Sequence, residues 1–142
     1  MNIFPTQRPF ICKLLTFIGL LGPLLAGCGT SSRREWAMAR HFPAEAWQRD
    51  RRGCAGERQQ LVAALDSLRR DLRGFSQDEI VEVLGRPDAQ RLEPRNQKLF
   101  VYFLEKGPQC QQPTTESPAR TVAVRFNATG YVTEITYHSG RP

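Results

Sequence analysis

The feature that most constrains this 142-residue chain is a short apolar run near its N-terminus that leads into a cysteine. The run covers residues 14–25 and follows two basic residues. It spans about 12 residues, whereas a bilayer-crossing helix needs roughly 20. It ends in a four-residue motif of one apolar residue, two small residues and a cysteine: Leu25, Ala26, Gly27 and Cys28. These properties are typical of an export signal, which is removed rather than folded.

The same four residues match the bacterial lipobox, in which a cysteine thiolate takes up a diacylglyceryl group. We therefore expect cleavage after Gly27 and a lipid anchor on Cys28, formed by diacylglycerol and an N-acyl chain. The small polar residues 29–32 would then serve as a flexible tether. A plain secretory signal with a chance cysteine is the alternative. No other cofactor is expected.

Cysteine usage predicts one disulfide bond. Of the four cysteines, Cys12 lies in the signal and Cys28 is the lipid site. The remaining pair, Cys54 and Cys110, would enter an oxidising compartment, where a disulfide is stable. Such a bond closes a loop of about 57 residues and stabilises the fold by about 4 kcal/mol in the chain-entropy model. Two independent buried thiols are the alternative. No metal site is expected, because the two histidines show no ligand spacing with these cysteines.

The charge of the chain is basic, at +6, and arginine supplies most of it. Several arginines follow the lipid site closely, among them Arg33, Arg34, Arg49, Arg51 and Arg52. Near a membrane each attracts anionic head groups by about 1 kcal/mol, but a solvated linker is the favoured interpretation. Trp36 and Trp47 in the same segment are expected either at the membrane interface or docked on the domain. Nucleic acid is not an expected partner, because export removes the chain from it.

Two helices are predicted. Within residues 55–73, leucines recur at intervals of four, three and four, which places them on one face: Leu61, Leu65, Leu68 and Leu72. The charged residues of this segment, Arg58 among them, are expected outside that face. A second helix is predicted to begin at the capping box Ser76-Gln77-Asp78-Glu79 and to end at Gly85.

After the second helix the apolar period becomes two, which predicts strands at residues 90–93, 97–105, 120–126 and 131–137. The segment 97–105 is apolar on both faces, so it is expected to be a central strand. Val132 and Ile135 fall on opposite faces of the last strand. This spacing predicts either a bulge between them or cover on both faces.

These elements predict an α+β fold, with two helices packed on one face of a three- to four-stranded antiparallel sheet. The predicted organisation runs in four parts. Residues 1–27 are the signal peptide and residues 28–53 are the lipid anchor and a linker. Residues 54–138 are the folded domain and residues 139–142 are a disordered tail.

The run from Gly74 to Val81, the segment Leu84–Asp88 and the later strand motifs resemble the SmpA/OmlA (BamE-like) family of outer-membrane lipoproteins. The strand motifs are an aromatic strand with Tyr102, then 122–126 (VAVRF) and 130–132 (GYV). The resemblance implies a fold of two helices on an antiparallel sheet, which β-lactamase-inhibitor-like domains also have. It also implies a location on the periplasmic side of the outer membrane. The chain departs from the family in its charged first helix and in the Cys54–Cys110 pair.

The sequence holds no nucleophile elbow and no glycine-rich phosphate loop, so an enzyme is not expected. The expected function is a membrane-anchored protein–protein interaction module of the cell envelope, in outer-membrane assembly or integrity. A periplasmic inhibitor or an envelope-stress binding module is the alternative. The candidate partner-binding residues are Arg86, Tyr102 and the loop from Gln109 to Glu116, with a core position for Tyr102 as the alternative.

Overall fold

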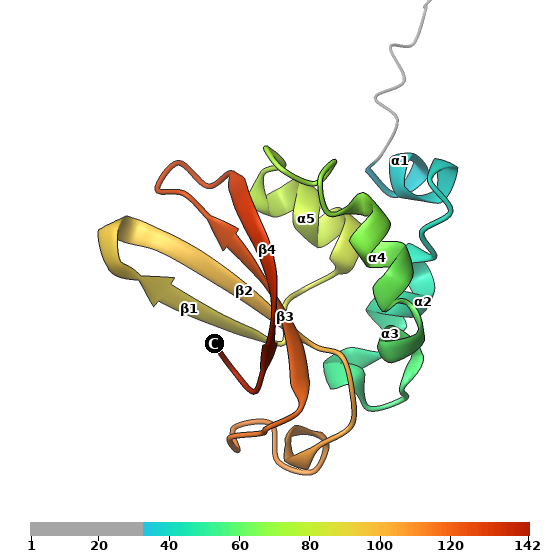
Figure 1. The fold of residues 1–142 in the computed structure, drawn as a ribbon, viewed down its shortest axis with the longest axis vertical. Helices are drawn as coiled ribbons and strands as arrows, with labels where there is room; N and C mark the ends of the chain where they lie inside the picture. The colour runs from blue at the N-terminus through green and yellow to red at the C-terminus, as the bar shows by residue number, and fades with distance from the viewer. Residues whose placement is uncertain (1–32) are drawn as a thin grey trace, which may run out of the picture.

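The fold of the chain was obtained as a computed structural model that describes residues 33–142 (Figure 1). The predicted signal peptide, its cleavage motif and the lipid site at Cys28 lie outside the described residues. No helix within residues 33–142 is long and apolar enough to cross a membrane.

The sheet is a four-stranded antiparallel meander in the order β1-β2-β3-β4. Its strands are β1 (Ala89–Glu93), β2 (Gln97–Phe103), β3 (Arg120–Phe126) and β4 (Val132–Ser139). The predicted α+β class and all four strands are confirmed. Alternating apolar residues identify strands because successive side chains of a pleated strand point to opposite faces of the sheet. The central position of β2 is confirmed as well.

A register shift next to Phe126 resolves the spacing problem in β4. Arg125 pairs with Glu134, but Phe126 pairs with Val132, so one residue of β4 is skipped. The extra residue turns both Val132 and Ile135 toward the core, where each is 4% exposed. The bulge is therefore the correct one of the two predicted alternatives.

The capping box is confirmed at the start of α5 (Gln77–Leu84). The Ser76 hydroxyl accepts from the backbone N–H of Glu79 at 3.3 Å, and the Glu79 carboxylate accepts from the backbone N–H of Ser76 at 2.8 Å. Gly85 ends the helix with φ of +73°, a conformation that favours glycine. Ile80, Val83 and Leu84 are fully buried on the apolar face of the helix.

The single helix predicted at residues 55–73 is wrong in extent. The chain forms α3 (Glu57–Gln60) and α4 (Val62–Leu68) with a break at Leu61, and turns follow α4. Gly56, with φ of +81°, prevents an earlier start. The predicted apolar face persists beyond the break, because its later leucines are buried: Leu65, Leu68 and Leu72.

Residues 33–53 are not a linker, and this boundary is corrected. They form α1 (Arg33–Ala39), α2 (Ala44–Arg49) and the 3-10 turn η1 (Arg51–Gly53). Ala37 and Trp47 are 0% exposed and Phe42 is 1% exposed, so the segment supplies part of the main core. Docking on the domain is thus confirmed for Trp47. Pro43 interrupts the apolar period between the two helices, which is why the sequence pattern is weak here.

The predicted disordered tail is also wrong at its start. β4 runs to Ser139, which pairs with Arg120. The next residue, Gly140, is held through its backbone. Its N–H donates to Ala119 O at 3.0 Å, and its carbonyl accepts from the Thr121 hydroxyl at 2.6 Å.

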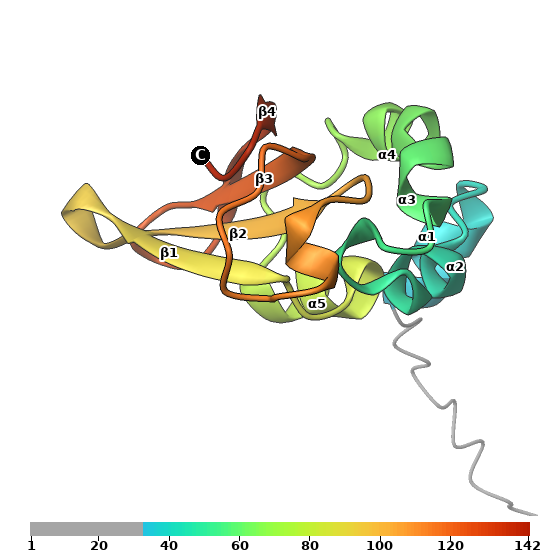
Figure 2. The ribbon, with the colours of Figure 1, turned by 90° about the horizontal axis from the view of Figure 1, so that it is seen from below.

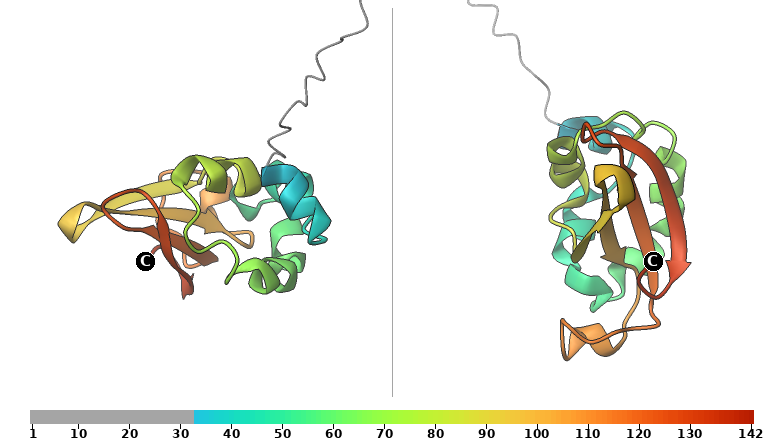
Figure 3. Two further views of the ribbon diagram at one scale, coloured as in Figure 1. Left: turned by 90° about the horizontal axis from the view of Figure 1, so that it is seen from above. Right: turned by 90° about the vertical axis from the view of Figure 1, so that its left-hand side faces the viewer.

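All the helices lie on one side of the sheet or beyond one end of it (Figures 1 and 2). The main core joins them to the inward side chains of the strands, such as Phe100, Val124 and Phe126. A smaller cluster on the other face consists of Leu99, Val101 and Ala123. The β1–β2 hairpin projects away from the helices, and α1 lies at the opposite end of the molecule (Figure 3).

We expect Trp47→Ala to lower the free energy of unfolding by about 3–5 kcal/mol, because it empties a large site in the core. The matched control is Met38→Ala, which changes a 63%-exposed side chain in the same segment. Its effect should stay within about 0.5 kcal/mol. Urea unfolding followed by circular dichroism measures the free energy of unfolding of both variants. Equal losses would contradict the core position of Trp47 and support the prediction that residues 28–53 are a linker.

Candidate functional site

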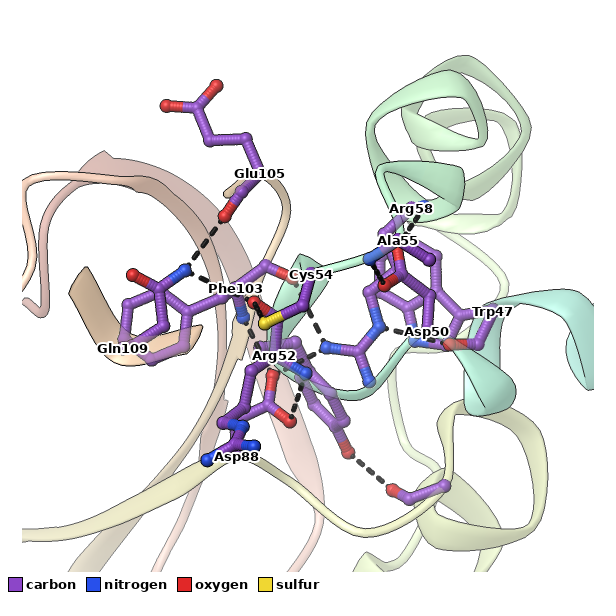
Figure 4. A network of polar contacts seen from close by, with 12 residues as sticks. Trp47, Asp50, Arg52, Cys54, Ala55, Arg58, Asp88, Phe103, Glu105 and Gln109 are labelled. Atoms are coloured by element: carbon purple, nitrogen blue, oxygen red, sulfur yellow. Dashed lines mark hydrogen bonds and ion pairs between the residues drawn. The ribbon is translucent and has the colours of Figure 1, made fainter. Parts of the chain in front are cut away.

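The centre of the molecule holds a buried arginine, Arg58, which is 0% exposed. Its Nη1 donates to Asp88 Oδ2 at 2.5 Å and to the carbonyl of Phe103 at 3.2 Å. Its Nε donates to the carbonyl of Trp47 at 3.0 Å (Figure 4). One side chain of α3 therefore binds the end of α2, the segment before β1 and the end of β2.

Two carboxylates complete this polar cluster. Asp88 accepts from the backbone N–H groups of Arg52 at 3.1 Å and Phe103 at 2.9 Å. Asp50 accepts from the backbone N–H groups of Ala55 at 2.7 Å and Arg58 at 2.8 Å, so it caps the start of α3 from outside the helix. Because every carboxylate oxygen accepts at least one hydrogen bond, the buried charges are stabilised.

Aromatic rings enclose the guanidinium. The carbon Cζ of Arg58 lies 5.2 Å from the ring centre of Trp47 and 5.6 Å from that of Tyr102, within cation–π range. The Tyr102 hydroxyl donates to the carbonyl of Gly85 at 3.0 Å. Burial raises the pKa of Tyr102 above its ordinary value. The ring therefore stays neutral and serves as packing.

The predicted disulfide bond is confirmed. Cys54 and Cys110 are joined with a Cα–Cα distance of 5.7 Å, and they link the end of η1 to the 3-10 turn η3 (Pro108–Cys110). Gln109 strengthens the link, because its amide donates to the carbonyls of Arg52 at 3.1 Å and Glu105 at 2.8 Å. The hydroxyl of Ser117 donates to the other end of the Gln109 amide.

Gly53 allows η1 to lie directly against the sheet. It has φ of +67°, and a Cβ atom on it would lie 2.7 Å from the backbone nitrogen of Glu105. A side chain here would collide with backbone, which cannot move aside. The contact between η1 and the end of β2 therefore requires glycine.

A second set of contacts fixes α1. The Nε of Arg33 donates to the Glu79 carboxylate at 2.7 Å, and its guanidinium lies 4.4 Å from the ring centre of Phe75. The guanidinium of Arg40 lies 4.2 Å from the ring centre of Trp36, which in turn lies 4.9 Å from that of Phe75. These contacts hold one face of α1 against α5 and the segment before it.

Two of the predicted partner-binding residues are wrong, because Tyr102 and Gln109 are each 0% exposed. The core alternative is correct for Tyr102. Gln109 is buried because its amide bonds to two carbonyls of neighbouring segments. Arg86 and Glu116 are exposed and stay candidates. Glu116 borders an open groove of about 720 Å³ whose other walls include Arg91 and Arg141.

The exposed large apolar side chains of the described chain lie in two regions. Met38 on α1 is 63% exposed, and a groove of about 280 Å³ lies beside it, between α1 and α2. Leu92 is 74% exposed and Tyr131 is 49% exposed. Across the sheet, Leu92 of β1 pairs with Lys98 of β2, Lys98 pairs with Phe126 of β3, and Phe126 pairs with Val132 of β4. Tyr131 is the residue before Val132. Leu92 and Tyr131 therefore lie at the same end of the sheet.

The cluster around Arg58 was not found from the sequence, although one signal was present. Arg58 precedes Leu61 by three residues and so continues the leucine stripe, which places it on the buried face rather than outside it. Its partners Asp50 and Asp88 come from distant segments. Within residues 33–142, no group of three or more His, Cys, Asp or Glu side chains is placed to hold a metal ion.

Neither a protein-family model nor a curated protein or solved structure matches this chain.

We expect Arg58→Met to destabilise the protein by about 3–5 kcal/mol, because it leaves Asp88 as a buried carboxylate without its cation. The matched control is Arg69→Met, which removes an exposed ion pair with Asp66 of 3.4 Å. That change should cost less than about 1 kcal/mol. The urea concentrations at the midpoint of unfolding compare the stabilities of the two variants. Similar losses of stability would contradict a central role for Arg58.

The hydrogen bond from the backbone N–H of Ser76, and then the Arg33 guanidinium, hold the pKa of Glu79 below its ordinary value of 4.5. The carboxylate therefore stabilises the fold above about pH 4.5, and this contribution is lost as the pH falls through the lowered pKa. Glu79→Gln should reduce stability at pH 7 and flatten the loss of stability in acid. Thermal melts between pH 3 and 7 test this, and an unchanged acid slope would contradict it.

Proposed function

We propose that this chain is a lipid-anchored lipoprotein of the bacterial cell envelope whose folded domain binds another envelope protein. The motif Leu25–Cys28 supports the anchor. The folded domain begins at Arg33, five residues after Cys28, so the domain would stand directly above the membrane. Gly29 follows the lipid site, where an aspartate would favour retention in the inner membrane. The BamE-like resemblance favours the periplasmic side of the outer membrane.

The observation that carries the proposal is the disulfide between Cys54 and Cys110. Disulfides persist in oxidising compartments and are rare in the cytosol. The bond therefore supports export independently of the N-terminal motif. It also ties η3 to η1, the turn that follows α2.

A binding role, rather than catalysis, is supported by how the buried charges are used. The Arg58 cluster is enclosed and its carboxylates already accept hydrogen bonds from the chain. The exposed apolar residue Leu92 lies on the β1–β2 hairpin, which projects beyond the helices, and the exposed Tyr131 lies at the same end of the sheet beside the start of α5. In the described chain β1 and β4 are the edge strands. Because residues 74 and 75 already bond the backbone of Val132 at the start of β4, a partner could pair with β1 or with the later part of β4. We propose this sheet end, with Arg86 and Glu116 as secondary candidates, as the partner surface.

We expect the protein purified from detergent-solubilised membranes to have the mass of residues 28–142 plus acyl chains, less two hydrogens for the disulfide. An outer-membrane protein should co-purify with it. Leu92→Asp combined with Tyr131→Asp should abolish that co-purification, while Ala63→Asp, at an exposed position of α4 away from the sheet end, should not.

Other outcomes separate the parts of the proposal. An unacylated mass would refute the anchor. An acylated protein that instead retains a soluble periplasmic enzyme would favour the inhibitor or stress-module alternative.

A further inference from the structure

We infer that the outer faces of α1 and α2 form a membrane-binding surface that takes anionic phospholipid head groups around an inserted Met38. The inference rests on the proposed lipid anchor at Cys28. We call this region the α1–α2 surface and define it by Arg34, Met38, Pro43, Ala46 and Arg49. A membrane, rather than a protein, is the occupant that its chemistry and position favour.

The α1–α2 surface combines an apolar floor with a basic rim. Met38, Pro43 and Ala46 line its groove of about 280 Å³, and Arg34 and Arg49 lie at its edges. Glu45 is the acidic residue of the lining. An apolar side chain among arginines is the composition of surfaces that lie in the head-group region of a bilayer.

The contacts of α1 fix which way this surface faces. Arg33, Trp36 and Arg40 are engaged with the rest of the domain through Glu79, Phe75 and Asp71. Arg34 and Met38 lie four residues apart and so share another face of the helix, which the domain does not cover. The exposure of Met38 is therefore a consequence of how α1 docks.

The rim arginines are available to head groups. Arg34 donates a hydrogen bond to the side chain of Gln48 at 3.1 Å, and it remains exposed. Arg49 pairs with Glu57 at 3.2 Å, with 68% of the arginine side chain exposed. Exposed ion pairs of this kind are weak, so a phosphate can replace the carboxylate. A guanidinium also binds phosphate through two parallel hydrogen bonds.

The length of chain before α1 places this surface beside the bilayer. Arg34 follows Cys28 by six residues, which span at most about 21 Å even when fully extended. The lipid on Cys28 would therefore keep α1 close to the head groups in every orientation of the domain. With the anchor at this end, the β1–β2 hairpin points away from the membrane (Figure 3).

The test uses the mature acylated protein in vesicles of phosphatidylcholine alone, or of phosphatidylcholine with phosphatidylglycerol. Met38→Cys supplies a single free thiol for a nitroxide label, because Cys54 and Cys110 are bonded to each other and Cys28 carries lipid. The matched label site is Ala128→Cys, on the exposed β3–β4 turn. The accessibility of each nitroxide to oxygen and to a water-soluble nickel chelate is measured by electron paramagnetic resonance.

We expect the label at residue 38 to be shielded from nickel and open to oxygen in the anionic vesicles, while the label at residue 128 stays open to nickel. Arg34→Gln with Arg49→Gln should shift the docking equilibrium toward the undocked state by about 30-fold, as expected for two lost arginine contacts. The control pair is Arg91→Gln with Arg95→Gln on the β1–β2 hairpin, which likewise removes one arginine of an exposed ion pair and a second exposed arginine. It should leave the docking equilibrium unchanged.

Three results would overturn the inference. Equal nickel accessibility at residues 38 and 128 in anionic vesicles would show that the surface stays in water. Dipolar broadening between labels at residue 38, increasing with protein density, would assign the surface to a second copy of the chain. Equal effects of the two arginine pairs would show nonspecific charge attraction. The intact mass is measured on the same sample, so a missing anchor, which refutes the proposed function, is distinguished from an anchored domain that does not dock.

Discussion

The buried guanidinium of Arg58 is the interaction on which the rest of this fold depends. It bonds to the end of α2, to Asp88 before β1 and to the end of β2. A buried ion pair contributes little net stability compared with apolar packing, but removing one partner is very costly. Its main effect is therefore specificity. The guanidinium and both carboxylates are satisfied in this arrangement, and a shift of the helices along the sheet would break their hydrogen bonds.

The disulfide and Gln109 extend this arrangement to the longest loop. The loop between β2 and β3 would otherwise be free to move, because it is polar and rich in proline. Cys110 joins it to η1, and Gln109 bonds both η1 and the end of β2. Since η1 also carries the Arg52 N–H that bonds Asp88, the covalent link and the buried ion pair stabilise the same junction.

The sequence predicted those parts of the fold that arise from local rules. The strands follow from alternation, α5 from its capping box, and the disulfide from the number of cysteines left after export. Two of the failures share a cause. Whether Arg58 is buried depends on Asp50 and Asp88, and whether α2 forms part of the core depends on contacts such as that between Trp47 and Tyr102. Such partners are far apart in the chain, and no local period reveals them.

Rigidity connects the two proposed surfaces. If α1 were a flexible tether, an anchor at Cys28 would leave the orientation of the domain undefined. Because Arg33, Trp36 and Arg40 dock α1, and because Arg58 and the disulfide lock the next helices to the sheet, the position of α1 determines that of the β1–β2 hairpin. A membrane contact at the α1–α2 surface would then direct the β1–β2 hairpin, with Leu92, away from the bilayer. The buried charges would thus serve binding indirectly, by presenting the sheet end to a partner at a fixed height.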